Sequence, residues 1–258
     1  MKTVLNIVSY NICACADYSK PKDDNGKEIV SVDNTAKVLS SLNADVYGLQ
    51  EVFMKGPDAR YEEQGRRIAE KMAFRHFVYA KGQETDWGNS VDEIGNAVIS
   101  RFPIVRHEVF SVLKPDESER RPDENDWYED RVLLETEIAL PDGRHVVFMA
   151  THFGLNLLER EKIIKTVCER LDKTKLPVIL VGDFNARPEG KELTPIYARL
   201  TNVAKALGKE ENTFASFDPQ VILDYIFVSS DFKPVEFKVC KVIASDHYPI
   251  FAKLELHD

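Results

Sequence analysis

An apolar run in the second half of the chain ends abruptly in polar side chains. Residues 177–182 read Pro-Val-Ile-Leu-Val-Gly, and Asp183 and Asn185 follow, two residues apart. Because successive side chains of a β-strand point to opposite faces, this spacing places both polar groups on one face. A buried strand that ends in a carboxylate and an amide indicates the beginning of an active site.

The same arrangement recurs along the chain. Apolar runs also end in Asn11, in Glu51 and in Thr151-His152, and a Ser245-Asp246-His247 cluster lies near the C-terminus. Five polar ends of this kind predict that the residues meet at one shared edge of the fold.

The composition indicates a globular chain with a substantial core. The 258 residues are 43% hydrophobic and 30% charged, and we expect them to form a single domain over residues 1–258. The formal net charge of -9 argues against a broad positive surface for duplex nucleic acid, although a local basic groove stays compatible with it.

The N-terminal residues predict neither a signal peptide nor a membrane span, because few apolar residues precede Ser9. We therefore expect no transmembrane segment and a cytoplasmic location, although a leader removed earlier would leave no trace.

Four cysteines are few for a disulfide scaffold, so we expect buried or half-buried free thiols at Cys13, Cys15, Cys168 and Cys240.

Predicted strands outnumber predicted helices. Helices are expected over residues 33–42 and 157–171, and Asn156 with Glu159 three residues later is placed to cap the second one. His152 precedes that helix closely and so lies where a strand ends, a common position for catalytic residues. Strands are expected over residues 4–12, 45–50, 97–100, 132–138, 146–150, 178–181, 225–228 and 250–256.

Three long segments are expected to be surface loops: residues 17–27, 81–93 and 114–130. Trp87 and Trp127 lie in the second and third of them. Each tryptophan could stack on a base, a sugar or a lipid headgroup, or could instead hold its loop against the core.

The polar residues suit phosphoester chemistry. Mg²⁺ takes oxygen ligands and often only one or two protein carboxylates, so Glu51 with Asn11 would suffice. Asp183 is a candidate base for an attacking water, and Asn185 could hold that water or a phosphate oxygen. His152 and His247 could donate hydrogen bonds to nonbridging oxygens.

Each motif alone also has a plain structural explanation. Gly-Asp-Phe-Asn at residues 182–185 is compatible with a strand-ending turn, Glu51 with a solvated strand end, and the Ser-Asp-His cluster with a capped loop. Their joint occurrence favours a functional site.

Seven motifs in order along nearly the whole chain resemble the endonuclease/exonuclease/phosphatase superfamily. They are Ser9-Tyr10-Asn11, Gly48-Leu49-Gln50-Glu51-Val52, Gly95-Asn96-Ala97-Val98-Ile99-Ser100-Arg101, Thr151-His152, Gly182-Asp183-Phe184-Asn185, Leu223-Asp224-Tyr225-Ile226 and Ser245-Asp246-His247.

The resemblance implies an α/β (α+β) four-layer sandwich: two mostly antiparallel sheets packed face to face, helices on the outer faces, and the site at one end. It also implies a Mg²⁺ cofactor, for which Mn²⁺ can substitute. The resemblance implies that Asn11 and Glu51 bind the metal, and that Asp246 either binds the metal or orients a histidine. It implies that Asp183 activates the water together with Asn185, and that His247 contacts the phosphate with Asp224 as its carboxylate partner. His152 would contact the phosphate or the leaving group, and Arg131 and Asn96 would lie near the phosphate.

The predicted function is Mg²⁺-dependent hydrolysis of a phosphoester, with a phosphodiester as first choice, by in-line attack of a water that Asp183 activates. The alternatives are a nuclease acting on DNA or RNA, as an endonuclease, an exonuclease or a deadenylase-like enzyme, and a non-catalytic binding module that keeps the fold. The substrate could be a small molecule, a lipid headgroup or a nucleic acid. Residues 221–225 disfavour the inositol polyphosphate 5-phosphatase branch, and residues 151–156 with the acidic charge disfavour abasic-site repair nucleases. The sequence leaves the oligomeric state open.

Overall fold

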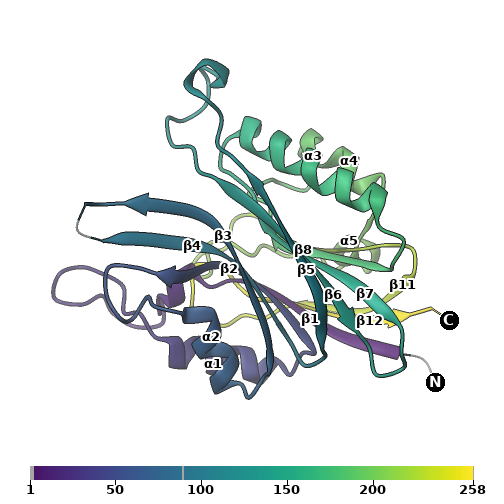
Figure 1. Ribbon diagram of the computed structural model, residues 1–258. Helices are drawn as coiled ribbons and strands as arrows, with labels where there is room; N and C mark the ends of the chain where they lie inside the picture. The colour runs from purple at the N-terminus through teal and green to yellow at the C-terminus, as the bar shows by residue number, and fades with distance from the viewer. Residues whose placement is uncertain (1–2, 89, 258) are drawn as a thin grey trace.

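The computed structural model describes residues 3–88 and 90–257, which build two six-stranded sheets (Figure 1). The first sheet has the strand order β11-β12-β1-β2-β4-β3. Its strands are β1 (Thr3–Asn11), β2 (Val46–Lys55), β3 (His76–Asp86), β4 (Val91–Ser100), β11 (Phe232–Val239) and β12 (Ile250–Leu256).

The second sheet has the order β5-β6-β7-β8-β10-β9. Its strands are β5 (Ile104–Val112), β6 (Arg131–Ala139), β7 (His145–His152), β8 (Val178–Asp183), β9 (Thr201–Asn202) and β10 (Asp224–Val228). Within each sheet the neighbouring strands are antiparallel except for one central pair, β1 with β2 and β7 with β8. The expectation of two mostly antiparallel sheets is confirmed.

Helices cover the two outer faces. In Figure 1, α1 (Val32–Leu42) and α2 (Gln64–Lys71) lie on the face of the first sheet that points away from the second sheet. The helices α3 (Leu157–Lys173) and α4 (Thr194–Tyr197) lie on the corresponding outer face of the second sheet. The short helix α5 (Val203–Ala206) contacts β10 and β11. Short 3-10 turns are η1 (Cys13–Cys15), η2 (Glu117–Glu119) and η3 (Lys191–Leu193).

Three buried hydrophobic clusters correspond to the three interfaces between these four layers. The middle cluster, which includes Val98, Phe148 and Val181, fills the space between the sheets. A second joins β1, β2 and β4 to α1 and α2, and a third joins the other sheet to α3 and α4. Gly48 of β2 permits close approach of the sheets, because a Cβ there would lie 2.3 Å from Val181 Cγ2.

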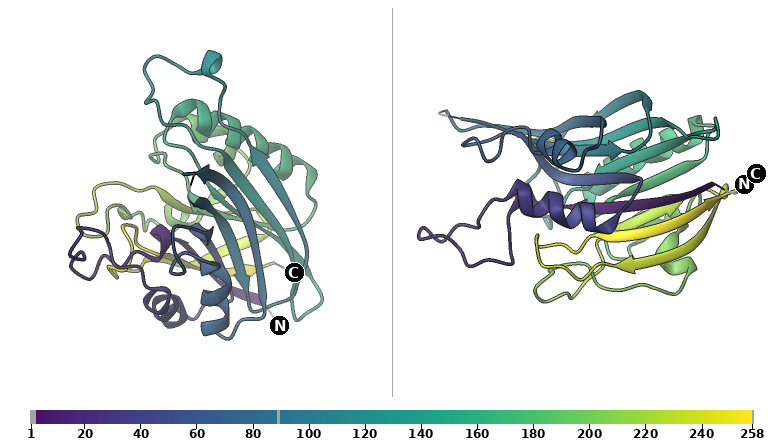
Figure 2. Two further views of the ribbon diagram at one scale, coloured as in Figure 1. Left: turned by 60° about the vertical axis from the view of Figure 1, so that its left-hand side comes forward. Right: turned by 90° about the horizontal axis from the view of Figure 1, so that it is seen from below.

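Both ends of the described chain lie at the same end of the sandwich (Figure 2). β1 and β12 are antiparallel neighbours, and Thr3 is paired with Leu256. None of the helices in the described ranges is long and apolar enough to cross a bilayer.

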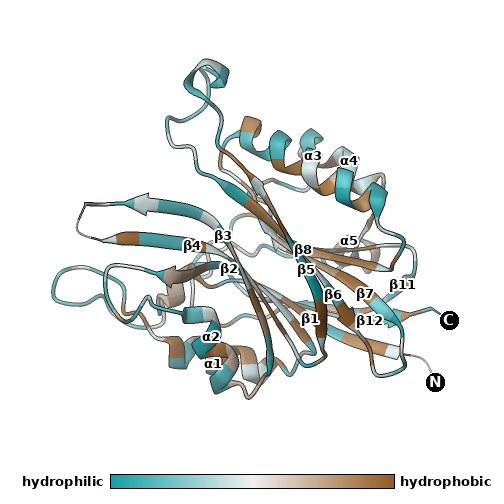
Figure 3. Cartoon of the chain, in the orientation of Figure 1, coloured by the Kyte–Doolittle hydropathy of each residue, from teal (hydrophilic) through white to brown (hydrophobic). Residues whose placement is uncertain are grey.

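The expectation of a loop over residues 81–93 is wrong, because β3 and β4 form a hairpin arm there. The two strands stay paired to Asp86 and Val91. The arm projects beyond the sandwich and is largely hydrophilic (Figure 3). Its sequence therefore lacks the alternation of apolar and polar residues by which strands are recognised. Trp87, near the tip, donates a hydrogen bond from Nε1 to Asp92 Oδ2 at 2.9 Å.

Neither tryptophan holds its loop against the core. Trp87 is 61% exposed and Trp127 is 58% exposed. Residues 17–27 and 114–130 do lack strands, and in the second segment η2 is the one described helical turn.

The 114–130 loop is instead fixed to the N-terminus of α3. The Leu158 backbone N–H donates to Glu124 Oε1 at 2.8 Å, and Asn156 Nδ2 donates to the Trp127 carbonyl oxygen at 3.1 Å. Glu159 Oε1 accepts from the Glu129 N–H at 2.9 Å, while its Oε2 accepts from the Asn156 N–H at 3.2 Å. The residues expected to cap α3 therefore also position the loop that leads into β6.

Candidate active site

The ends of the central strands bring the candidate residues together. Because β1 and β2 run parallel, Asn11 at the end of β1 lies beside Gln50 of β2. The parallel pair β7 and β8 likewise places His152 beside Asp183. Asp224, the first residue of the antiparallel strand β10, is paired with Asp183. The two parallel pairs thus direct their carboxyl ends to one end of the sandwich.

Two candidate residues have left-handed backbone conformations. Glu51 has a φ of 54° and lies within the register shift between Leu49 and Val52, so β2 bulges there. Asn185 has a φ of 44°, and its N–H donates to Asp183 Oδ1 at 2.9 Å. Such conformations are costly for residues other than glycine, and they cluster at functional sites where they redirect a side chain.

Asn11 connects two carboxylates through its amide nitrogen. Asn11 Nδ2 donates to Glu51 Oε1 at 2.9 Å and to Asp183 Oδ2 at 3.1 Å. Its Oδ1 accepts from the Cys13 N–H at 3.0 Å. In this orientation Asn11 presents donors to the site, which differs from the expectation that it supplies an oxygen ligand to a cation.

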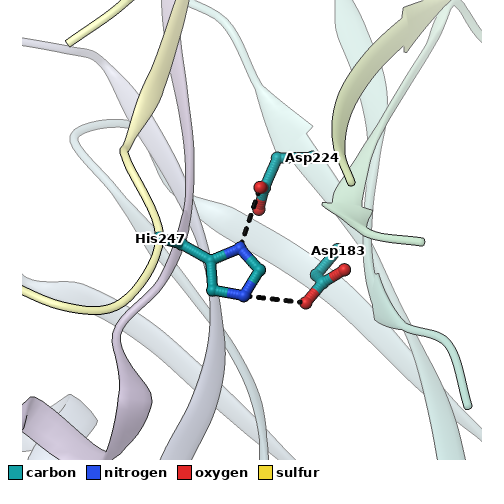
Figure 4. Close-up of side chains that lie close together, drawn as sticks. All are labelled: Asp183, Asp224 and His247. Carbon is teal, nitrogen blue, oxygen red and sulfur yellow. Dashed lines mark hydrogen bonds and ion pairs between the residues drawn. The ribbon is translucent and has the colours of Figure 1, made fainter. Parts of the chain in front are cut away.

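His247 lies between two aspartates (Figure 4). Its Nδ1 is 2.9 Å from Asp224 Oδ2, and its Nε2 is 3.4 Å from Asp183 Oδ2. Burial lowers the pKa of His247, but the carboxylates of Asp224 and Asp183 outweigh burial and raise this pKa to about 10. His247 is therefore an imidazolium at neutral pH, which donates a hydrogen bond from Nδ1 to Asp224 and forms an ion pair through Nε2 with Asp183.

His152 is held in the opposite protonation state. Burial, with added repulsion from Arg131 and His247, holds the pKa of His152 well below its usual range. Asn185 Nδ2 lies 3.1 Å from His152 Nε2 and donates to the Phe153 carbonyl oxygen at 2.9 Å. An amide nitrogen can only donate, so Nε2 of the neutral ring accepts and the proton lies on Nδ1.

Asp183 is the point where these contacts converge. Its Oδ1 accepts from the Asn185 backbone, while its Oδ2 faces Asn11 and the Nε2 atoms of both histidines. Burial raises the pKa of Asp183 to about 7, against the opposing effect of the His247 cation. A carboxyl group poised near neutral pH is suited to accept a proton.

Asp246 lies on the Glu51 side of the site. The Ser245 hydroxyl is 2.8 Å from the Asn11 carbonyl oxygen and 3.1 Å from Asp246 Oδ1, which ties this segment to the end of β1. Burial raises the pKa of Glu51, and the Asp246 carboxylate raises it further. Two acidic side chains therefore repel each other here.

Arg131 and Asn96 line a pocket beside the carboxylates, which we call the side pocket. It has a volume of about 170 Å³ and shares Glu51 and His152 with the site described above. Its other polar walls come from Gln83 on the β3–β4 arm and from Glu129 and Asp130 at the end of the 114–130 loop. Sequence reasoning missed Gln83, Glu129 and Asp130, because nothing in the sequence indicates that these two segments meet.

Comparisons with known proteins identify the family of this chain. The family model described as the Endonuclease/Exonuclease/phosphatase family matches residues 8–247. The uncharacterized protein YbhP of Escherichia coli strain K12 is 26% identical over 239 residues, which cover 84% of this chain and 86% of YbhP. Members of the family are typically hydrolases that act on phosphoester bonds.

Solved structures share the fold at lower identity. An endonuclease/exonuclease/phosphatase from Beutenbergia cavernae superposes with a TM-score of 0.78 at 23% identity, covering 98% of this chain and 72% of that one. The mannosyl-6-phosphatase Bt3783 of Bacteroides thetaiotaomicron gives a TM-score of 0.71 at 20% identity, covering 97% and 99%. Truncated TDP2 of Caenorhabditis elegans gives 0.66 at 18% identity, covering 98% and 97%. With a family match over nearly its whole length and this fold, the chain belongs to the endonuclease/exonuclease/phosphatase family.

Proposed function

We propose that the protein is a Mg²⁺-dependent hydrolase of phosphoesters, with a phosphodiester as the preferred bond. The observation that carries this proposal is the position of Asp183. Its buried carboxylate accepts a hydrogen bond from Asn11 and lies 3.4 Å from the Nε2 atoms of His152 and His247. The carboxylate of Asp183 has a pKa near neutral pH and lies between the protonated ring of His247 and the neutral ring of His152. This arrangement is suited to the attack of water on phosphorus.

The acidic residues on the Asn11 side fit a divalent cation. Glu51 and Asp246 would hold it, because burial and the neighbouring Asp246 carboxylate both raise the pKa of Glu51, and a cation there would offset the repulsion between the two carboxylates. When bound, Mg²⁺ would supply positive charge that polarises the phosphoryl group.

A second acidic group is a poorer cation site. Asp183, Asp224 and His247 have ligand atoms within 4.8 Å of one another. However, both His247 nitrogens are directed at carboxylates, and the raised pKa of His247 makes the ring a cation at neutral pH. A charged imidazolium has no lone pair for a metal, so we assign this group to proton transfer and phosphate contact.

The remaining residues are assigned roles in the attack. Asp183 Oδ2 takes a proton from the attacking water, and Asn185 orients Asp183 through its backbone. The imidazolium of His247 donates to a phosphoryl oxygen and is kept charged by Asp224. The neutral His152 is placed to contact the phosphate or the leaving group, and a phosphate near it would raise its pKa.

A nuclease is the second candidate, because the description of the family names endonucleases and exonucleases beside phosphatases, and fold alone does not set the substrate. The net charge of -9 favours a substrate with few phosphates. Salt dependence separates the two candidates. An oligonucleotide that makes several phosphate contacts loses affinity steeply as salt rises, whereas a small phosphoester does so weakly.

Hydrolysis of bis-p-nitrophenyl phosphate with Mg²⁺ or Mn²⁺ tests the proposal. We expect Asp183→Asn to lower kcat by at least about 100-fold, the scale for loss of one preorganised catalytic group, and no added Mg²⁺ should restore it. Asp172→Asn is the matched control, because Asp172 is exposed and pairs with Arg199. Equal rates for the native protein and both variants would support the non-catalytic binding module instead.

A further inference from the structure

The side pocket offers hydrogen-bonding groups that the protein itself leaves unused. Arg131 is 9% exposed and pairs with Glu129 through Nη2 at 2.6 Å, but its buried Nε has no partner among the described residues. Asn96 Nδ2 donates to the Val132 carbonyl oxygen at 3.0 Å, and no described residue donates to its Oδ1. A buried donor without a partner is costly, so its presence beside a cavity indicates a ligand.

The lining excludes several classes of ligand. Glu51, Glu129 and Asp130 line the side pocket together with a single arginine, so a second phosphate would meet more negative than positive charge. Among the described residues, His152 contributes the one aromatic ring of the lining, which leaves little surface for a base to stack on. Ile94 and Val132 give the lining some apolar surface, but its charged and amide side chains are unsuited to a long acyl chain.

We propose that the side pocket binds a polyhydroxylated arm of the phosphoester, such as a sugar or another polyol. This inference rests on the proposed phosphoester hydrolysis, since the pocket shares Glu51 and His152 with that site. Carboxylates accept hydrogen bonds from hydroxyl groups, whereas guanidinium and amide nitrogens donate to them, so the mixed lining matches a row of hydroxyls that do both. A volume of about 170 Å³ suits one small ring and lies below the range of about 300–1,000 Å³ for drug-sized ligands.

Gly82 provides a way to fill the pocket. A Cβ at Gly82 would lie 3.4 Å from Val132 Cγ1, 3.5 Å from the Ile94 carbonyl oxygen and 3.7 Å from the Asp130 carbonyl oxygen, which is ordinary contact with three residues of the lining. A larger side chain there would occupy the cavity while the arm keeps its backbone. Gly95 cannot serve, because its Cβ would lie 1.9 Å from the Ala80 carbonyl oxygen.

The test uses three p-nitrophenyl phosphodiesters that share one leaving group and differ in the retained arm: methyl, cyclohexylmethyl and glucos-6-yl. For the native protein we expect kcat/KM for the glucosyl ester to exceed that for the cyclohexylmethyl ester at least about tenfold, because loss of the hydroxyls leaves buried polar groups unpaired. In Gly82→Val, kcat/KM should fall at least about tenfold more for the glucosyl ester than for the methyl ester. Glu84→Gln is the control, because Glu84 is exposed on the same arm outside the lining and should leave the ratios unchanged.

Equal kcat/KM for the glucosyl and cyclohexylmethyl esters, or an equal loss for all esters in Gly82→Val, would overturn the proposal. A binding measurement distinguishes failure of the polyol proposal from failure of the hydrolase proposal. Calorimetric titration of Asp183→Asn with glucose 6-phosphate and with cyclohexylmethyl phosphate should show the sugar phosphate binding at least about tenfold more tightly, even if no ester is hydrolysed. Equal binding of the two phosphates would also sink the inference.

Discussion

The two histidines beside Asp183 are in different electrostatic environments although each has its Nε2 3.4 Å from Asp183 Oδ2. His247 has a second carboxylate, that of Asp224, at its other ring nitrogen. His152 is instead kept neutral by burial and by repulsion from the positive charges of Arg131 and His247. One ring is therefore a fixed donor and the other can gain a proton once phosphate arrives. This division of roles is the residue-level basis of the proposed hydrolysis.

The His247 pKa gives a prediction for the metal-free protein in a chelating buffer. NMR titration should place the His247 pKa near 10, and Asp224→Asn should lower it by removing the larger of the two carboxylate effects. Because the folded pKa is raised above 6.5, the associated stability is fully present below pH 6.5 and is lost as pH rises through about 10. The difference in unfolding free energy between the native protein and Asp224→Asn should accordingly shrink from pH 6 to pH 10. A native His247 pKa near 6.5 would contradict the ion pair.

Glu51→Gln is expected to act through the cation. The glutamine keeps an acceptor for Asn11 Nδ2 but removes a charge, so kcat at low Mg²⁺ should fall by about 100-fold to 1,000-fold. Raising Mg²⁺ should restore at least about tenfold of that loss, which distinguishes this variant from Asp183→Asn. Glu236→Gln, an exposed change on β11, is the control and should keep the native Mg²⁺ dependence. Equal rescue of the Glu51 and Asp183 variants would contradict the separate roles.

At this scale, the sequence predicted that separate polar strand ends share one edge, and the structure brings Asn11 within hydrogen-bonding distance and His247 within ion-pair distance of Asp183. The amide orientation of Asn11 could not be predicted, because it depends on the Cys13 N–H and two carboxylates from other strands. Nor could the two histidine states, which follow from burial and distances that only the assembled fold defines.

Among the elements, the eight strands inside the two sheets were predicted from sequence, and the four strands at the sheet edges, β3, β5, β9 and β11, were not. Inner strands are buried on both faces and read as apolar runs, whereas edge strands carry charges and proline that discourage pairing with other chains. β11 contains Pro234 and Glu236, and β5 contains Arg106 and Glu108. For the same reason the sequence did not predict the β3–β4 arm, and without the arm the side pocket could not be predicted.

The junction of α3 with the 114–130 loop gives a prediction at the scale of elements. Asn156→Ala removes the helix cap and the bonds to the Asn125 and Trp127 carbonyl oxygens, so we expect a loss of about 1–2 kcal/mol in the free energy of urea unfolding. Asn25→Ala, an exposed change in the 17–27 loop, should change it by less than about 0.5 kcal/mol. Identical unfolding curves for the two variants would mean that the loop does not depend on the α3 N-terminus.

For the whole molecule, the four layers followed from the family resemblance and are confirmed by the two sheets and by the three apolar clusters. The expectation of a single domain over residues 1–258 stays a prediction. The architecture explains why the site lies where it does: each sheet has one parallel pair, and both pairs end at the same end of the sandwich. The arm and the 114–130 loop then add the side pocket, which is the part of the site that we expect to set the substrate.

The most direct test of the account is the position of Mn²⁺ in crystals soaked with Mn²⁺ and inorganic phosphate, located by anomalous scattering. We predict a peak bonded to Glu51 at about 2.1 Å, with Asp246 beside it and phosphate between the ion and His247. A peak bonded to Asp183, Asp224 or a neutral His247, with Glu51 left without an ion, would contradict the assignment of cation binding and proton transfer to opposite sides of the site.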